Sequence, residues 1–561
     1  MISHISFEAP AQWDPIQLVW DNLATDNIVD RIWSRDHTVW KPKADEISNR
    51  LAWLDIAKTM WDEVPDINQF VSDVLRDGYT DAVLLGMGGS SLAPEVFSKV
   101  LGKPEGFLRL HILDSTDPGQ IRDILERINL PKSLFIVSTK SGGTVETLSG
   151  LKYFFNEMTD AVGIDKTGEH FVAITDPGSS LEKIGAGHKF RRVFLNDPNI
   201  GGRYSALSYF GLVPAALVGV DLTRLLSEAI HEMEKAKSDP ARNASATTGA
   251  VIATLAQLGK DKLTFLIPGK LAPFGDWVEQ LIAESTGKDN VGILPVVGEE
   301  VGLPEDYNSD RTFVMIRHFN DESLFGYTLA LGEAGHPVIS MTYEDEHDLG
   351  GLMFLWEMAT AIAGHVLGIQ PFDQPNVESA KIRGRDFLAS LQRDGKLAQQ
   401  TSIATDDGLT VFGQGTGGSV SAAINEFVEL TRFGDYISLQ AYLTPNPLHD
   451  ELLNLLRLAL RTRFKCATTV GYGPRFLHST GQLHKGDRGN GLFIQITCDE
   501  PNDIAIPDQA GSDTSSLSFG TLKLSQALGD AEALREVGRR VLRVHLAKQA
   551  EGLSKLISIL R

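Results

Sequence analysis

Cysteine is almost absent from this chain of 561 residues, which contains only Cys466 and Cys498. Two thiols without a CxxC pair, and without a His/Cys cluster at metal-ligand spacing, do not make a disulfide framework or a zinc site, so we expect both thiols to be buried and reduced. The sequence has no run of 18 apolar residues, and its start, MISHISFEAPAQWD, lacks a basic segment followed by a long apolar one. These absences predict a soluble, cytoplasmic protein.

Positively charged residues are also scarce. The chain has 52 lysines and arginines but 73 aspartates and glutamates, so its net charge is −21. Such a surface repels the phosphates of nucleic acids and anionic lipids, so neither nucleic acid nor membrane is an expected partner. An anionic small molecule would then need a local pocket of cations, hydroxyls or backbone amides. The length predicts two or three domains.

The chain divides into one helical segment and three series of expected strands. Residues 1–75 carry aromatic and aliphatic side chains at helical spacing, which predicts a helical arm. In residues 76–235, apolar runs such as DAVLLGMGG and SLFIVSTKSGG alternate with helical segments, which indicates a doubly wound parallel sheet covered on both faces. Similar series occupy 236–390 and 391–561, and the last one either stands alone or completes the second domain in a rearranged order. The predicted fold class is α/β with tandem doubly wound parallel sheets.

A glycine-rich turn, LLGMGGSS, follows the first of these strands and places Gly86, Gly88, Gly89, Ser90 and Ser91 before an expected helix. Glycine lets a ligand approach the backbone closely, and a helix N-terminus offers free N–H groups to an anion. Many glycine-rich turns only connect two elements, so this turn alone does not decide between the two interpretations.

The segment VSTKSGGTVET carries Thr139, Lys140, Ser141 and Thr144 where a second strand enters a helix. Three hydroxyls and an ammonium with no carboxylate among them suit a phosphate monoester. The alternative is a helix cap beside a solvated lysine. The density of hydroxyls favours phosphate, and the GxxxxGK[ST] spacing of a nucleotide-binding loop is absent.

Five motifs together resemble the phosphoglucose isomerase family, which is built from sugar-isomerase (SIS-type) domains: GMGGSS, STKSGGTVET, NIGGRYSAL, EQLIAESTGK and QPFDQPNVESAK. Four of them follow the family order over residues 80–290, and FDQPNVESAK, at 372–381, resembles the terminal signature. More narrowly, the chain is similar to the isomerase half of bifunctional transaldolase/phosphoglucose isomerase proteins. The resemblance implies a cofactor-free interconversion of glucose 6-phosphate and fructose 6-phosphate, in glycolysis and gluconeogenesis, through a cis-enediolate.

The family pattern assigns roles to individual residues. Glu284 matches the base that moves a proton between two adjacent carbons, and Gln280, four residues earlier on the same helix face, matches a substrate contact. Arg203 matches the cation beside the reacting carbons, where it would stabilise the enediolate oxygen. Gln374 and Lys381 match positions that line the pocket near the sugar ring. The phosphate would bind the 139–144 turn, with help from Gly89 and Ser90.

The histidine that opens the sugar ring in this family is out of place, because no histidine between Glu284 and Lys381 has the family context. A better fit lies in ATTVGYGPRFLHSTGQLHKGDRGNGLFIQIT, where His478 opens a short helix between two strands. We expect His478 to open the ring, since imidazole titrates near working pH, with help from Lys381. His484 is the second candidate, and a structural histidine is the alternative.

Two other functions remain open. A sugar-phosphate-sensing module would share the fold but would not need Glu284 and Arg203. An isomerase of broader specificity would also accept mannose 6-phosphate; Ser91 in place of a usual Asp, and SGG in place of a bulkier run, make this credible. The family commonly forms dimers, so a homodimer or an association with transaldolase is the implied partner beside the sugar phosphate. All of this requires Glu284 and Arg203 to face each other near the 139–144 turn.

Overall fold

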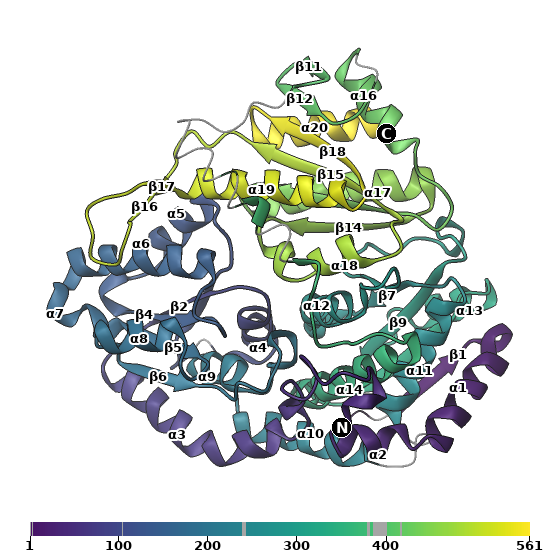
Figure 1. Cartoon of the computed structure of the whole chain (residues 1–561), viewed down its shortest axis with the longest axis horizontal. Helices are drawn as coiled ribbons and strands as arrows, with labels where there is room; N and C mark the ends of the chain where they lie inside the picture. Colours follow the sequence, from purple (N-terminus) through teal and green to yellow (C-terminus); the bar gives the residue numbers. More distant parts are fainter. Residues whose placement is uncertain are drawn as a thin grey trace.

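Three sheets flanked by helices form most of the molecule, and a two-stranded ribbon is the fourth sheet in the part of the chain that the structure describes (Figure 1). The structure is a computed structural model. It describes residue 2 and the ranges 4–103, 105–237, 243–377, 382–384, 387, 401–415 and 418–561. The predicted α/β class with doubly wound parallel sheets is confirmed.

The first sheet is parallel throughout, with the order β3-β2-β4-β5-β6. Its strands are β2 (Asp81–Gly86), β3 (Arg109–Leu113), β4 (Ser133–Ser138), β5 (Phe171–Thr175) and β6 (Arg192–Leu195). The central strands are buried along their whole length, as expected for a sheet that has helices on both faces. Those helices are α4 (Leu92–Leu101), α5 (Pro118–Arg127), α6 (Val145–Val162), α7 (Ile164–Thr167), α8 (Ser180–Gly187) and α9 (Tyr209–Leu217).

The second sheet includes a strand from the N-terminal segment, in the order β1-β10-β9-β7-β8. Its strands are β1 (His4–Glu8), β7 (Lys262–Leu266), β8 (Leu294–Val296), β9 (Arg311–His318) and β10 (Val338–Tyr343). Only β1 is antiparallel. The segment 1–75 is therefore not purely helical: beside α1 (Trp13–Thr25), α2 (Ile28–Trp33) and α3 (Ile56–Arg76) it supplies an edge strand. The strand β1 has only five residues, which is too short for the alternation of apolar and polar side chains to predict it.

The third series of strands forms a sheet of its own, in the order β11-β12-β18-β15-β13-β14. Its strands are β11 (Ala404–Asp406), β12 (Leu409–Phe412), β13 (Tyr436–Tyr442), β14 (Ala467–Tyr472), β15 (Gly491–Cys498) and β18 (Arg540–Leu546), and its helices are α16 (Val420–Val428), α17 (Pro447–Phe464), α18 (Gly481–Gly486), α19 (Phe519–Glu536) and α20 (Gln549–Leu560). The ribbon is β16 (Ala505–Ile506) with β17 (Leu517–Ser518). A separate hydrophobic cluster fills this unit. The exact domain boundaries stay a prediction.

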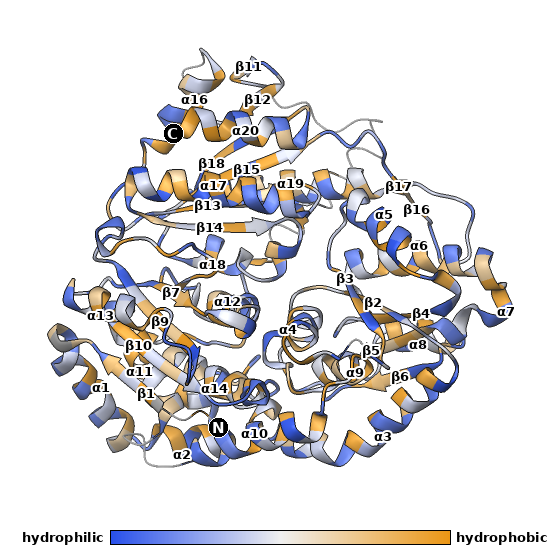
Figure 2. Ribbon diagram, turned by 180° about the vertical axis from the view of Figure 1, so that it is seen from behind, coloured by the Kyte–Doolittle hydropathy of each residue, from blue (hydrophilic) through white to orange (hydrophobic). Residues whose placement is uncertain are grey.

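One helix of the second unit, α14 (Leu349–Leu367), is apolar enough to resemble a membrane span, but 89% of its apolar window is buried in the fold. It packs between α10 (Leu222–Lys235) and α11 (Ala244–Gln257). Glycines permit this packing, because a Cβ on Gly350 would lie 2.1 Å from the Leu225 carbonyl oxygen of α10. This helix is therefore part of the core. In contrast, peripheral helices such as α3 alternate hydrophobic and hydrophilic residues (Figure 2).

The three units meet around α12 (Phe274–Thr286), α4 and α18, with α13 (Phe325–Glu333) at the outer side of the second sheet (Figure 1). The first unit contributes the ends of its strands and the starts of its helices to this junction. The third unit contributes the turn after β14, which is the 3-10 helix Arg475–His478. Residues from all three units can therefore reach one site.

Candidate active site

The carboxyl ends of β2 and β4 flank the point at which the first sheet changes its winding direction. The chain leaves β2 towards β3 on one side and returns to β4 on the other, and ligands of doubly wound folds bind at such a point. Gly86 pairs with Ser138 at the ends of the two strands. The glycine-rich turn and the 139–144 turn are therefore neighbours, as the sequence predicted.

The glycines after β2 allow three distant segments to approach one another. Gly88 has a φ of +54°, and a Cβ there would lie 2.5 Å from the His478 carbonyl oxygen and 2.8 Å from Gln280 Nε2. A Cβ on Gly89 would lie 2.0 Å from the Gly202 carbonyl oxygen. No side chain fits at either position. The turn thus brings the 202–203 segment, α12 and the His478 turn together, and the half-buried Ser90 follows it.

The 139–144 turn gathers hydroxyl groups at the start of α6. The Thr139 and Thr144 hydroxyl oxygens lie 2.8 Å apart, and the Ser141 hydroxyl accepts from the Gly143 N–H at 3.3 Å. Thr144 is the N-cap of α6 but its side chain makes no cap hydrogen bond. The start of α6 can thus direct backbone N–H groups toward an anion.

Lys140 does not extend freely into this turn. Its ammonium group forms an ion pair with Asp176 and donates to the Pro198 carbonyl oxygen at 2.8 Å. The positive charge therefore lies beside the turn, held by partners that the sequence pattern did not reveal.

Glu284 and Arg203 face each other at the junction of the units. Glu284 Oε1 lies 3.4 Å from Arg203 Nη1, and both residues are buried, with 7% and 3% of their surface exposed. Gln280 Nε2 donates to Glu284 Oε2 at 3.0 Å and to the His478 carbonyl oxygen at 2.7 Å. The helix geometry explains the contact with Glu284, since positions four residues apart share a face of α12.

The guanidinium of Arg203 is held by several further acceptors. Nε donates to the Ser285 hydroxyl at 2.8 Å, and Nη2 donates to the carbonyl oxygens of Pro371 at 2.6 Å and Asp373 at 2.9 Å. Nη1 also donates to Gln374 Oε1 at 3.4 Å. A planar fork with this many fixed partners has little freedom to move, which suits a group that stabilises a developing charge. Gln374 thus belongs to the site.

His478 reaches the site from the third unit. It ends the 3-10 helix after β14, and its Nε2 lies 2.9 Å from Oε1 of Glu146 in the first turn of α6. The first and third units therefore meet across this contact. A buried carboxylate, a fixed guanidinium, a histidine paired with a second carboxylate and a hydroxyl-rich turn therefore lie together.

Comparison with known proteins shows the family to which the chain belongs. The family model "Phosphoglucose isomerase" matches residues 67–292. The glucose-6-phosphate isomerase of Rubrobacter xylanophilus is 31% identical over 356 residues, which are 55% of this chain and 82% of that protein. The chain belongs to the phosphoglucose isomerase family. The probable glucose-6-phosphate isomerase of Methanococcus maripaludis is 28% identical over 393 residues, 63% of this chain and 88% of that protein.

Solved structures show the same fold. A hypothetical protein of Thermus thermophilus superposes with a TM-score of 0.59 at 24% identity, over 69% of this chain and all of that one. A glucose-6-phosphate isomerase of Chlamydia trachomatis gives a TM-score of 0.58 at 18% identity, over 67% of this chain and 86% of that one. The family match and the curated relatives confirm the predicted resemblance to the phosphoglucose isomerase family, whereas the narrower likeness to the transaldolase fusions stays a prediction.

The structure distinguishes the two histidines considered for ring opening in this family member. His484, in α18, is fully enclosed between Tyr436 and Phe493, and this burial lowers its pKa well below the ordinary value. It lies in the interior of the third unit, whereas His478 lies at the junction. Lys381, the second residue predicted for this step, lies outside the described residues.

Two residues of this phosphoglucose isomerase site were not singled out from the sequence. Glu146, the partner of His478, lies within the VSTKSGGTVET motif, so its place two residues after Thr144 was the available signal. Lys288, the last residue of ESTGK, donates to the Asp373 carbonyl oxygen at 2.6 Å and to its carboxylate at 2.7 Å. It therefore anchors the segment whose carbonyl groups hold Arg203.

The charge of Lys288 should make stability depend on pH. Burial, followed by the positive charge of Arg203, lowers its pKa from 10.5 to about 8. Between these two values the unfolded chain binds more protons than the folded one, so raising the pH favours folding, by up to about 1.4 kcal/mol per pH unit. We expect the thermal midpoint of the wild type to rise relative to that of Lys288→Met as the pH rises from 8 to 10.

Differential scanning fluorimetry at half-unit steps of pH measures this difference. The variant Lys270→Met is the control, because Lys270 is an exposed lysine that pairs with Glu346 at 3.6 Å. A constant difference between the wild type and Lys288→Met over this range would contradict the prediction.

Proposed function

We propose that this protein interconverts glucose 6-phosphate and fructose 6-phosphate through a cis-enediolate, with its own side chains and no cofactor. The observation that carries the proposal is the buried contact of 3.4 Å between Glu284 and Arg203, next to an anion-binding turn. A base beside a fixed cation is what an aldose–ketose isomerisation requires, because a proton leaves one carbon while negative charge collects on the neighbouring oxygen.

The phosphate group binds at the 139–144 turn. The hydroxyls of Thr139, Ser141 and Thr144, together with backbone N–H groups at the start of α6, donate to its oxygens. Ser90 and the Gly89 amide approach from the neighbouring turn. Lys140 supplies positive charge from the side, although its ammonium is shared with Asp176. This local set offsets a chain whose net charge is −21.

Ring opening precedes isomerisation. His478 takes the proton of the anomeric hydroxyl and delivers it to the ring oxygen as the hemiacetal C–O bond breaks, which gives the open-chain carbonyl and returns the imidazole to its starting state. Glu146 stabilises the imidazole from the side of Nε2, at 2.9 Å. Lys381 is proposed to help at the sugar ring, as its place in FDQPNVESAK implies.

Proton transfer then links the two sugars. Glu284 takes the proton from C2 of the open aldose and returns it to C1, so no atom is gained or lost. Gln280 holds the carboxylate through Oε2, and Arg203 faces Oε1, where it also stabilises the oxygen of the enediolate. Gln374, in contact with Arg203, contributes to the wall of the pocket.

A coupled assay with the purified protein tests the proposal directly. Fructose 6-phosphate is supplied, and formation of glucose 6-phosphate is followed through reduction of a nicotinamide by its dehydrogenase. Mannose 6-phosphate is tested as a second substrate. Ser91 in place of the usual Asp, and SGG in place of a bulkier run, leave a broader substrate specificity open. Binding of sugar phosphates without turnover would instead indicate a sensor module.

The setting of the enzyme is a further part of the proposal. We place it in the cytoplasm, acting in glycolysis and gluconeogenesis, and this is supported by two buried thiols at Cys466 and Cys498. A homodimer and an association with transaldolase are both open, and light scattering of the purified chain tests the first.

A further inference from the structure

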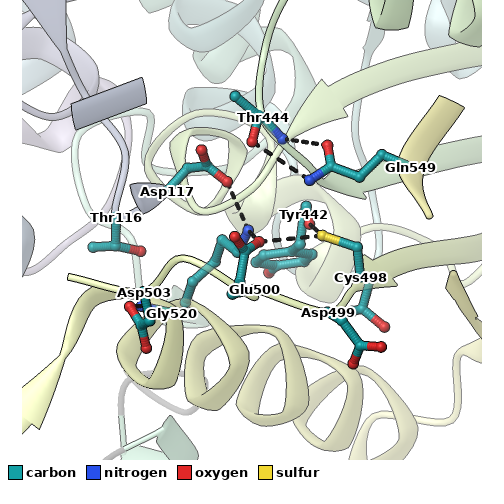
Figure 3. A network of polar contacts seen from close by, with 12 residues as sticks. Thr116, Asp117, Tyr442, Thr444, Cys498, Asp499, Glu500, Asp503, Gly520 and Gln549 are labelled. Atoms are coloured by element: carbon teal, nitrogen blue, oxygen red, sulfur yellow. Dashed lines mark hydrogen bonds and ion pairs between the residues drawn. The ribbon is translucent and has the colours of Figure 1, made fainter. Parts of the chain in front are cut away.

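Helix α19 belongs to the third unit but is anchored in the first. Phe519 and Leu522 join the hydrophobic cluster of the first sheet. Lys523, one turn after Phe519, donates through Nζ to the Asp117 carboxylate at 2.6 Å and also contacts Glu500. Figure 3 shows Thr116 and Asp117 beside the helix that begins near Gly520, with a dashed line from Asp117. The position of α19 relative to the first unit is therefore fixed by both apolar and charged contacts.

Gln526 extends this connection to the ring-opening histidine. Its Nε2 donates to Glu146 Oε1 at 2.6 Å, and its Oε1 accepts from the Thr116 hydroxyl at 2.8 Å. The same Glu146 oxygen lies 2.9 Å from His478 Nε2. Thr116 is fully buried. The side-chain amide thus lies between a hydroxyl of the first unit and the carboxylate that faces His478.

The direction of each hydrogen bond follows from the chemistry of the groups. An amide nitrogen only donates, so Glu146 Oε1 accepts. A carboxylate oxygen has no proton to donate, so in its bond with His478 the imidazole Nε2 carries the proton. Nδ1 of a neutral His478 is then the nitrogen with a free lone pair, and among the described residues it forms no hydrogen bond.

We infer that Gln526, supported by Thr116, is a positioning residue for ring opening: it orients the Glu146 carboxylate so that His478 is held in the tautomer whose Nδ1 exchanges a proton with the sugar. The inference depends on the proposed isomerase function. It gives α19 a specific task, because Gln526 of the third unit fixes the carboxylate of Glu146 in the first unit opposite His478.

The rate of anomer exchange distinguishes a role of Gln526 in ring opening from a purely structural role. Interconversion of α- and β-glucose 6-phosphate requires ring opening but leaves the C2 proton in place, and magnetisation-transfer NMR measures its rate. An acyclic sugar-acid phosphate of five carbons has no ring to open, and its affinity reports on the integrity of the pocket. We expect Gln526→Ala to reduce anomer exchange and kcat by about tenfold, as for one hydrogen bond to a charged group, with KM and this affinity unchanged.

Three further variants sharpen the test. Gln526→Glu keeps the size of the side chain but replaces the donor by a second acceptor, so we expect at least as large a loss. Thr116→Val should have a smaller effect in the wild type and no effect in the Gln526→Ala background, because the two residues act through one chain of bonds. Glu532→Gln is the control on the same helix, where the side chain is 44% exposed and pairs with Arg535.

The outcomes are distinct. Anomer exchange in Gln526→Ala equal to that of Glu532→Gln would overturn the inference. So would a loss of affinity for the acyclic phosphate that matches the loss of kcat, because the role would then be structural. A wild type that neither isomerises nor exchanges anomers would overturn the proposed function itself, whereas an active wild type with unaffected Gln526 variants overturns the inference alone.

Discussion

Glu284→Gln should abolish isomerisation of glucose 6-phosphate, with a fall in kcat of about 10³-fold or more, while binding of the phosphate is retained. The substitution removes the only group that we propose as carrier of the proton between C2 and C1, and general base catalysis contributes about 10²–10⁴-fold. The amide keeps the size of the carboxylate, and its oxygen can still accept from Gln280. The coupled assay measures kcat, and calorimetry with the acyclic sugar-acid phosphate measures binding.

The matched control lies on the same helix. Burial and the neighbouring Asp276 raise the pKa of Glu279 to about 8, so this carboxyl group is largely neutral at pH 7. Glu279→Gln should therefore change activity little. Anomer exchange should also persist in Glu284→Gln, because His478 is intact. Near-normal isomerisation by Glu284→Gln would refute the assignment of the base.

His478→Ala should slow turnover of both cyclic sugar phosphates by about 10²-fold or more, the usual contribution of a general acid. Anomer exchange should fall to the same extent, since both processes begin with ring opening. Removal of the imidazole leaves Glu284 and Arg203 in contact, so the proton-transfer step itself is retained.

A four-carbon aldose phosphate provides the discriminating substrate. Its terminal hydroxyl is esterified, so the sugar cannot close a ring, and isomerisation of this compound does not need His478. We expect the ratio of wild-type to His478→Ala rates to be much smaller for the tetrose than for glucose 6-phosphate. Equal losses on both substrates, or unchanged anomer exchange, would show that His478 has another role.

The core of the site could be predicted from the sequence because its residues lie in short motifs at the ends of regular elements. Gln280 and Glu284 are one helical turn apart, and their contact with each other follows from the geometry of α12. The meeting of Arg203 with Glu284 was expected only through the resemblance to the family. Its contact with the Pro371 carbonyl oxygen involves a residue 168 positions away, which no local pattern relates to Arg203.

The sequence did not reveal contacts that depend on tertiary structure. Lys140 was expected in the phosphate turn, but its ion pair with Asp176 depends on how the end of β5 approaches the turn. The edge strand β1 was missed because five residues carry too little periodic signal. The order of the strands in the third sheet is likewise set by pairing between segments far apart in the sequence, so local patterns did not predict it.

The origin of His478 in the third unit divides the chemistry between separate parts of the chain. The proposed base Glu284 and its guanidinium partner come from the second and first units, whereas the imidazole proposed for ring opening and the amide of Gln526 come from the third. Under the proposed roles, substitutions in the third unit would change the rate of ring opening without changing the rate of proton transfer between C2 and C1. Selection could adjust the enzyme to cyclic or acyclic phosphosugars without altering its carbanion chemistry.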